Sequence, residues 1–158
     1  MVDSVRVGGN TKTLDVTLSL TAGAYADNDV LADFQEVTDV MRATGEHGYV
    51  HSIVVMDEDD NAQAFDVVFA DANVSLGTES GAVSISDADA RSILGEVPVL
   101  TSDYKDYIGS QRATIRNVGL AIKASAGTKS IFVGAVLRSG TPTYTASGIR
   151  LKIVVAQD

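Results

Sequence analysis

The stretch "YVHSIVVMDEDDNAQAFDVVFA" (residues 49–70) decides the fold class. Two apolar runs, 49–56 and 64–70, flank a short segment with four consecutive acids. In the second run Phe65, Val67 and Phe69 recur at every second position, which is the period of a β-strand rather than of a helix. The first run is apolar on both faces, as in a strand buried at the centre of a sheet. The stretch therefore predicts two strands joined by an exposed turn.

The same pattern recurs on both sides of this hairpin. Alternation is seen in "TLDVTLSL" (13–20), "TIRNVGLAIK" (114–123) and "IRLKIVV" (149–155), and "SIFVGAVL" (130–137) is a second run that is apolar on both faces. Of the 21 acids 16 are Asp, which favours turns and caps over helix interiors. Six strands separated by turns rich in Gly, Asn, Asp, Ser and Thr predict an all-β antiparallel sandwich or barrel.

One short helix is predicted near 86–94, in "SISDADARSILGEV" (84–97). Ser86 can cap it, with Asp89 three residues on in the place of the Glu of a capping box. Gly95 is placed to terminate it. A helix of about two turns persists only if it rests on the sheet.

The segment 30–41 fits two elements equally well. Val30, Phe34, Val37 and Met41 keep helical spacing, whereas Phe34, Glu36, Thr38 and Val40 alternate as in a strand. Periodicity alone leaves helix and strand open here.

Length and composition predict a single soluble domain. A polar arm at 1–12, with Gly8 and Gly9, is predicted to be flexible, and residues 13–158 form one β-sandwich domain. The chain has no cysteine, no apolar run long enough for a membrane helix, and an N-terminus without the apolar core of a signal peptide. We therefore expect the protein to be made in the cytoplasm and not to associate with a membrane.

The formal net charge of −9 argues against nucleic acid as a partner, because phosphate contacts need a basic face. Residues 1–79 carry 3 basic and 15 acidic groups, net −12, whereas residues 80–158 carry 9 basic and 6 acidic groups, net +3. Two interpretations follow with equal weight. Either one face of a copy attracts a different face of its neighbour, or the two halves meet within one fold.

The acidic run is the first candidate site. Asp57, Asp59 and Asn61 match the first three positions of a calcium loop, D-x-[DN]-x-[DN]-G. The match stops there, because Ala62 replaces the glycine and Val68 replaces the bidentate glutamate. We predict a water-facing turn and no metal or other cofactor, and keep these three residues as the calcium alternative.

No catalytic constellation is visible in the sequence. His47 and His51 are expected on a strand, where about 13 Å would separate them and prevent a shared metal. No serine or threonine lies in a nucleophile context, and paired carboxylates lack an aromatic platform for a sugar. The sequence predicts that the protein is not an enzyme.

Ordered landmarks along the chain resemble a family of small structural proteins of tailed-bacteriophage virions. They are "AYADNDVL" (24–31), "HSIVVMDEDDNAQAFDVVFADA" (51–72), "ISDADARSILGEVPV" (85–99), "RNVGLAIKA" (116–124) and "IFVGAVLRSGTPTYTASGIRLKIVVAQD" (131–158). The resemblance implies a jelly-roll-like virion component, with capsid decoration (cement) as the leading role and no catalytic residues. It also favours strand at 34–41. The landmarks do not separate a head protein from a tail or head-tail component.

The sequence thus leads to two hypotheses of different classes. The favoured one is a non-enzymatic protein on the capsid exterior that binds the major capsid protein and forms a homo-oligomer, a trimer first and a dimer next. Its predicted contact residues are Arg6 and Lys12 of the arm, and Thr141, Pro142 and Tyr144 of the loop 139–148. The alternative is a jelly-roll carbohydrate- or receptor-binding module, assisted by calcium.

Overall fold

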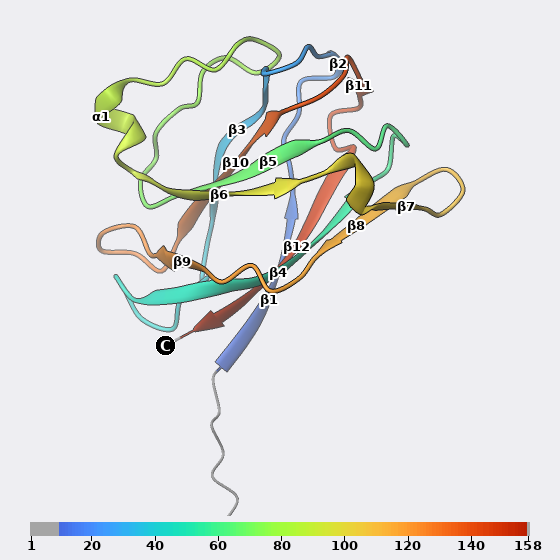
Figure 1. The fold of residues 1–158 in the computed structure, drawn as a ribbon. Helices are drawn as coiled ribbons and strands as arrows, with labels where there is room; N and C mark the ends of the chain where they lie inside the picture. The colour runs from blue at the N-terminus through green and yellow to red at the C-terminus, as the bar shows by residue number, and fades with distance from the viewer. Residues whose placement is uncertain (1–9, 158) are drawn as a thin grey trace, which may run out of the picture.

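A computed structural model describes residues 10–157, which form a sandwich of two antiparallel sheets (Figure 1). The first sheet is ordered β1-β12-β4-β8-β7, with β9 also paired to β4, and the second is ordered β3-β10-β5-β6. A two-stranded ribbon, β11-β2, stands at one end. The first sheet contains β1 (Asn10–Thr17), β12 (Ile149–Gln157), β4 (His47–Asp57), β8 (Gln111–Ile115), β7 (Tyr104–Asp106) and β9 (Leu120–Lys123). The others are β3 (Val30–Val37), β10 (Ile131–Leu137), β5 (Phe65–Ala70), β6 (Ile93–Val99), β2 (Gly23–Ala24) and β11 (Thr143–Tyr144).

The strand order is that of a jelly roll. We count β8 and β9 as one strand, because both pair with β4, and leave the short β2, β7 and β11 aside. The eight remaining strands, numbered along the chain, then follow the orders 1-8-3-6 and 2-7-4-5. First pairs with eighth, second with seventh, third with sixth and fourth with fifth, so the chain is one long antiparallel hairpin rolled into two sheets. The predicted all-β, jelly-roll-like sandwich is confirmed.

The predicted periodicities are confirmed in the best-defined strands. Phe65, Val67 and Phe69 of β5 are buried between the sheets, and Arg150 and Lys152 of β12 alternate with buried Leu151, Ile153 and Val155. The predicted strand 114–123 is in fact two strands. Its break lies at Asn117 and Gly119, whose φ values of 54° and 66° leave the extended range.

The short helix α1 (Asp87–Ala90) is where the sequence predicts one, but it is shorter. The Ser86 hydroxyl accepts a hydrogen bond from the Asp89 backbone N–H at 3.1 Å, which is the expected cap. The predicted end is wrong, because Ile93 and Leu94 already belong to β6. Gly95, with φ of 153°, lies in that strand beside a register shift rather than at a helix terminus.

The ambiguous segment 30–41 is a strand only over β3 (Val30–Val37). Residues 38–41 follow it as a bend, in which Asp39 has a φ of 54°. The strand favoured by the resemblance is therefore correct for 34–37 and wrong for 38–41.

The N-terminal boundary differs slightly from the expected one. Asn10, Thr11 and Lys12 of the predicted arm are paired with β12 as the first residues of β1. Residues 1–9 of that arm lie outside the described residues. No helix among residues 10–157 is long and apolar enough to cross a membrane.

One outer face of the sandwich is covered by the chain itself. Residues 71–92, here called the overhang, connect β5 to β6, carry α1 and cross the outside of the four-stranded sheet (Figure 1). Leu76 of the overhang packs on Val30, Val68 and Val136 of three different strands. A Cβ atom on Gly134 would lie only 2.9 Å from Leu76 Cδ1, so the glycine permits this close approach. The overhang explains why all seven residues of β10 are buried.

Candidate functional site

The acidic run forms a turn that is anchored by one buried carboxylate. Asp57 ends β4 and is 0% exposed. One of its oxygens, Oδ1, accepts a hydrogen bond from the Asp59 N–H at 3.0 Å. Its Oδ2 accepts from the N–H groups of Asn61 at 3.0 Å and Ala62 at 2.8 Å. The carboxylate therefore supplies the acceptors that the turn backbone needs away from water.

The other members of the run tie the turn to neighbouring segments. The Asp59 carboxylate accepts from the backbone N–H of Thr145 at 2.7 Å and also from its hydroxyl. It fills the space that a Cβ atom on Gly148 would need. Asn61 Nδ2 donates to the Thr143 carbonyl at 2.9 Å, and Gln111 Nε2 donates to Asp60 at 2.7 Å. The run thus links the turn to β8, β11 and the entry to β12.

These contacts bear on the calcium alternative. Each of Asp57, Asp59 and Asn61 already has protein partners, and three backbone N–H groups point at the Asp57 oxygens. An N–H donor and a cation compete for the same lone pairs. Within residues 10–157, no group of three or more His, Cys, Asp or Glu side chains is placed to hold a metal ion. The arrangement needs no cation to explain it.

Buried polar groups surround Asp57. Burial raises the pKa of Asp57, and its three backbone donors act in the opposite direction. Burial also raises the pKa of Tyr104 and of Tyr144, with the Asp57 charge adding to both. The Tyr104 hydroxyl donates to the Gln63 carbonyl at 3.0 Å, whereas the Tyr144 hydroxyl is buried without a protein partner.

Two of the predicted contact residues are buried within the fold. Tyr144 is only 2% exposed and packs edge to face on Tyr25, with ring centroids 5.9 Å apart, and Pro142 is buried beside it in the sequence. Neither can offer its side chain to another protein from this fold. Thr141 is exposed, and Lys12 reaches back to the Asp39 carbonyl. Arg6 lies outside the described residues.

Both histidines lie on β4, as predicted, and both are exposed. His47 is paired with Lys123 of β9, and His51 sits at the register shift between β4 and β12. Among residues 10–157, neither histidine belongs to a group of three or more potential metal ligands. They are surface residues of a strand.

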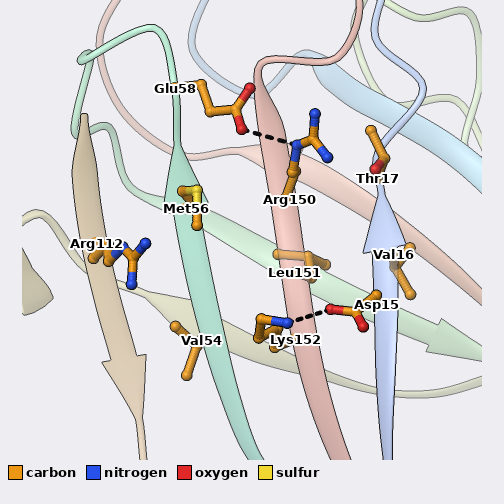
Figure 2. A pocket seen from close by; sticks show the side chains of 10 residues that line it. All are labelled: Asp15, Val16, Thr17, Val54, Met56, Glu58, Arg112, Arg150, Leu151 and Lys152. Atoms are coloured by element: carbon orange, nitrogen blue, oxygen red, sulfur yellow. Dashed lines mark hydrogen bonds and ion pairs between the residues drawn. The ribbon is translucent and has the colours of Figure 1, made fainter. Parts of the chain in front are cut away.

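The outer face of the six-stranded sheet is a basic surface that the sequence analysis missed. One row of cross-strand partners runs Thr17–Arg150–Met56–Arg112–Lys105 across five strands. The next row runs Asp15–Lys152–Val54–Thr114. Arginine and lysine side chains therefore stand around the two apolar side chains of β4, and a hollow of about 340 Å³ lies between them (Figure 2).

This surface, here called the basic face, differs in charge from the rest of the chain. Its outward strand positions carry five bases and one acid, Asp15, and a second acid, Glu58, follows β4 directly and lines the same hollow, for a formal charge of +3. The five bases are Lys105, Arg112, Lys123, Arg150 and Lys152. Because the whole chain carries −9, the remainder carries −12. The alternation of polar and apolar residues within each strand could have shown that each base points outward. Only the order of the strands shows that the five bases share one face.

The charge asymmetry of the two sequence halves is resolved inside the fold. The ion pairs are Arg138–Asp66 at 2.6 Å, Arg150–Glu58 at 2.9 Å and Lys152–Asp15 at 2.6 Å. Each joins a base of residues 80–158 to an acid of residues 1–79. Since β12 lies between β1 and β4, the halves interleave, and the interpretation that they meet within one fold is confirmed for these pairs.

The β7–β8 turn adjoins the basic face and carries an exposed apolar tip. Tyr107 is 61% exposed and Ile108 is 96% exposed. Ile108 and Gly109 have φ values of 57° and 88°, a backbone that suits Asn-Gly and is costly for a β-branched residue. The Arg112 guanidinium lies 5.3 Å from the centre of the Tyr107 ring and connects the tip to the basic face.

No family model matches the sequence, and no curated protein matches it. The structure is similar to a chain from the capsid of Ralstonia phage GP4, with 16% identity and a TM-score of 0.41, over 100% of this chain and 90% of that one. It is also similar to a chain of desmodium yellow mottle tymovirus, with 10% identity and a TM-score of 0.28, over 98% and 84% of the two chains. A marine algae virus of the order Picornavirales gives 8% identity and a TM-score of 0.28, over 94% and 68%. The jelly-roll assignment rests on the strand order, not on these three structures.

Proposed function

We propose that this protein is a non-enzymatic structural protein of a tailed-bacteriophage virion, which binds the capsid exterior as a decoration or cement protein. The observation that carries the proposal is the combination of a jelly-roll sandwich with a closed apolar interior and the virion-type landmarks of the sequence. Jelly rolls serve in viral capsids, and also in lectins and cupins. The fold alone therefore does not choose among these functions.

The interior of the sandwich supports binding over catalysis. The side chains between the two sheets are almost all aliphatic or aromatic, and among residues 10–157 the buried polar groups are Asp57, Ser130 and the hydroxyls of buried tyrosines. Asp57 is committed to its turn. Of the two described hollows, one lies on the outer face of the six-stranded sheet and the other lies at the edge of the sandwich, between β1 and β3. A cupin-type centre inside the sandwich would need histidines there, and both histidines are exposed.

A cement role sets physical requirements that this chain can meet. A rigid domain bound at every equivalent position of a symmetric shell needs only modest affinity per contact, because the contacts repeat. The partner in this proposal is the major capsid protein, and the protein is a homo-oligomer, a trimer first and a dimer next. The chain is made in the host cytoplasm and acts on the outside of the virion.

Exposed aromatic rings are the observation that favours a second candidate. Tyr49 is 50% exposed on β4, and Tyr107 stands on the β7–β8 tip. Exposed rings are the platforms on which sugars stack, so a carbohydrate- or receptor-binding module is the alternative.

Particles made without this chain test the proposal. We expect them to release their genome at a lower temperature than complete particles, and we expect purified protein added back to restore the difference. Particles of equal heat resistance with and without the chain would refute the cement role. Binding of the purified protein to a glycan array, with no binding to particles, would favour the second candidate.

A further inference from the structure

We propose that the basic face is the surface through which this protein docks onto an acidic protein surface of the particle shell, with the acidic remainder turned away from it. This inference rests on the proposed virion function, and it names the part of the chain that makes the contact. Three features of the face support it: an apolar floor, a segregated charge, and three bases that have no ion-pair partner among the described residues.

The apolar floor is the counterpart of a surface that the chain covers elsewhere. On the four-stranded sheet, the outward side chains of Val68 and Val136 are buried under the overhang. On the six-stranded sheet, Val54 and Met56 point outward from the central strand β4 and are only half-buried. The two side chains therefore stay partly accessible, unlike the residues of β10. The central strand β4 is apolar on both sides, and its outer side is thus partly exposed to solvent.

The charge of the face specifies an acidic partner. Five bases and two acids, Asp15 and Glu58, face outward here, in a chain whose other groups sum to −12. Interactions between exposed charges are screened beyond about 8 Å at physiological ionic strength. At contact, therefore, the sign of the face counts for more than that of the whole chain. An acidic surface is attracted to this face and repelled by the remainder, which fixes the orientation of docking.

Three of the bases have no ion-pair partner among the described residues. Arg150 and Lys152 are paired with Glu58 and Asp15, but Lys105, Arg112 and Lys123 are not paired. Lys105 and Arg112 are moreover direct cross-strand partners. Like charges directly opposite each other destabilise a sheet. Arg112 rests on the Tyr107 ring, but no carboxylate among residues 10–157 forms an ion pair with either base, and carboxylates of a partner would relieve this repulsion.

A charge-reversal pair with a matched control tests the inference. The face variant is Arg112→Glu with Lys123→Glu, which breaks no described ion pair. The control is Arg91→Glu with Lys129→Glu, two exposed bases away from the face, on the overhang and on the turn before β10. Both variants change the net charge by the same −4. Binding to purified particles that lack the chain is measured by co-sedimentation, after thermal melts confirm that each variant is folded.

We expect the face variant to bind at least about tenfold more weakly than the wild-type protein, and the control to stay within about twofold. A third variant, Met56→Gln, removes apolar floor without changing charge and is expected to weaken binding as well. Raising the salt concentration should weaken wild-type binding.

Other results would distinguish an error in the docking face from an error in the proposed function. If the wild-type protein binds particles and both charge variants bind equally well, the docking face is wrong while the cement role stands. If the wild-type protein binds no particles, the proposed function fails and the inference fails with it. Self-association in sedimentation velocity that only the face variant abolishes would make a second copy the occupant and would overturn the assignment to the shell. A gel shift of duplex DNA by the wild-type protein would overturn it in favour of nucleic acid.

Discussion

Removal of the Asp57 carboxylate should destabilise the protein more than any other change in the acidic run. Asp57→Ala leaves three backbone N–H groups of the turn without an acceptor. A hydrogen bond to a charged group contributes about 1.5–3 kcal/mol, and the turn can open partly to water, so we expect a loss of about 3–5 kcal/mol. For a chain of this length that corresponds to a fall in Tm of about 6–20 °C.

Asp57→Asn separates shape from charge. The amide oxygen can keep the two bonds now made to Oδ2, but its NH₂ group then faces the Asp59 N–H, so one bond is lost. We expect a loss of about 1–3 kcal/mol. Urea denaturation followed by circular dichroism measures both variants. Asp60→Asn, which alters an exposed side-chain pair with Gln111, is the control and should change stability by less than about 0.5 kcal/mol.

The dependence on pH gives an independent check. Burial raises the pKa of Asp57 above its ordinary value of 3.8, so the folded state binds this proton more tightly than the unfolded chain does. The wild-type protein should therefore gain stability relative to Asp57→Asn as the pH falls through the folded-state pKa toward 3.8. If Asp57→Ala and Asp60→Asn prove equally mild, Asp57 is not the anchor of the turn. If the stability difference does not vary with pH, burial and the three hydrogen bonds cancel in their effect on the pKa of Asp57.

Three further outcomes are expected. Ile108→Asn should raise the free energy of unfolding by about 1 kcal/mol, because Asn tolerates the positive φ of 57° that Ile108 adopts, and a loss of stability would show that the isoleucine packs on something. Tyr144→Phe should raise it by about 1 kcal/mol by removing a buried hydroxyl that has no protein partner, and a clear loss would show that the hydroxyl is satisfied. Millimolar calcium and EDTA should leave Tm unchanged, and a calcium-dependent rise that Asp59→Asn abolishes would establish the calcium site.

The sequence predicted most strands because a period of two survives wherever one face is polar. In β12, Arg150 and Lys152 alternate with buried neighbours, and the strand was predicted from that pattern alone. The break between β8 and β9 escaped because Val118 and Leu120 continue the alternation across it, while the turn depends on the φ values of Asn117 and Gly119. Helix α1 ended early because Ile93 and Leu94 pack better as strand residues of β6.

The surfaces could not be predicted, because periodicity does not tell what lies above a strand. Both β4 and β10 are apolar on two faces, yet only β10 is covered, by an overhang that is distant in sequence from it. The difference in charge between residues 1–79 and 80–158 was visible in the sequence. In the fold, strands from both halves lie side by side, so the charge differs between faces of the sandwich and not between halves of the chain. Tyr144 looked like a loop residue because Thr and Gly surround it, and only the contact with Tyr25 reveals that it is buried.

The copy number of the chain in purified phage particles tests the central claim most directly. Quantitative mass spectrometry against the major capsid protein measures it. A protein that binds a repeated site on the shell should be present at a ratio to the major capsid protein near one, or at a simple fraction of it. A handful of copies per particle would indicate a tail component, and complete absence from particles would contradict a virion function altogether.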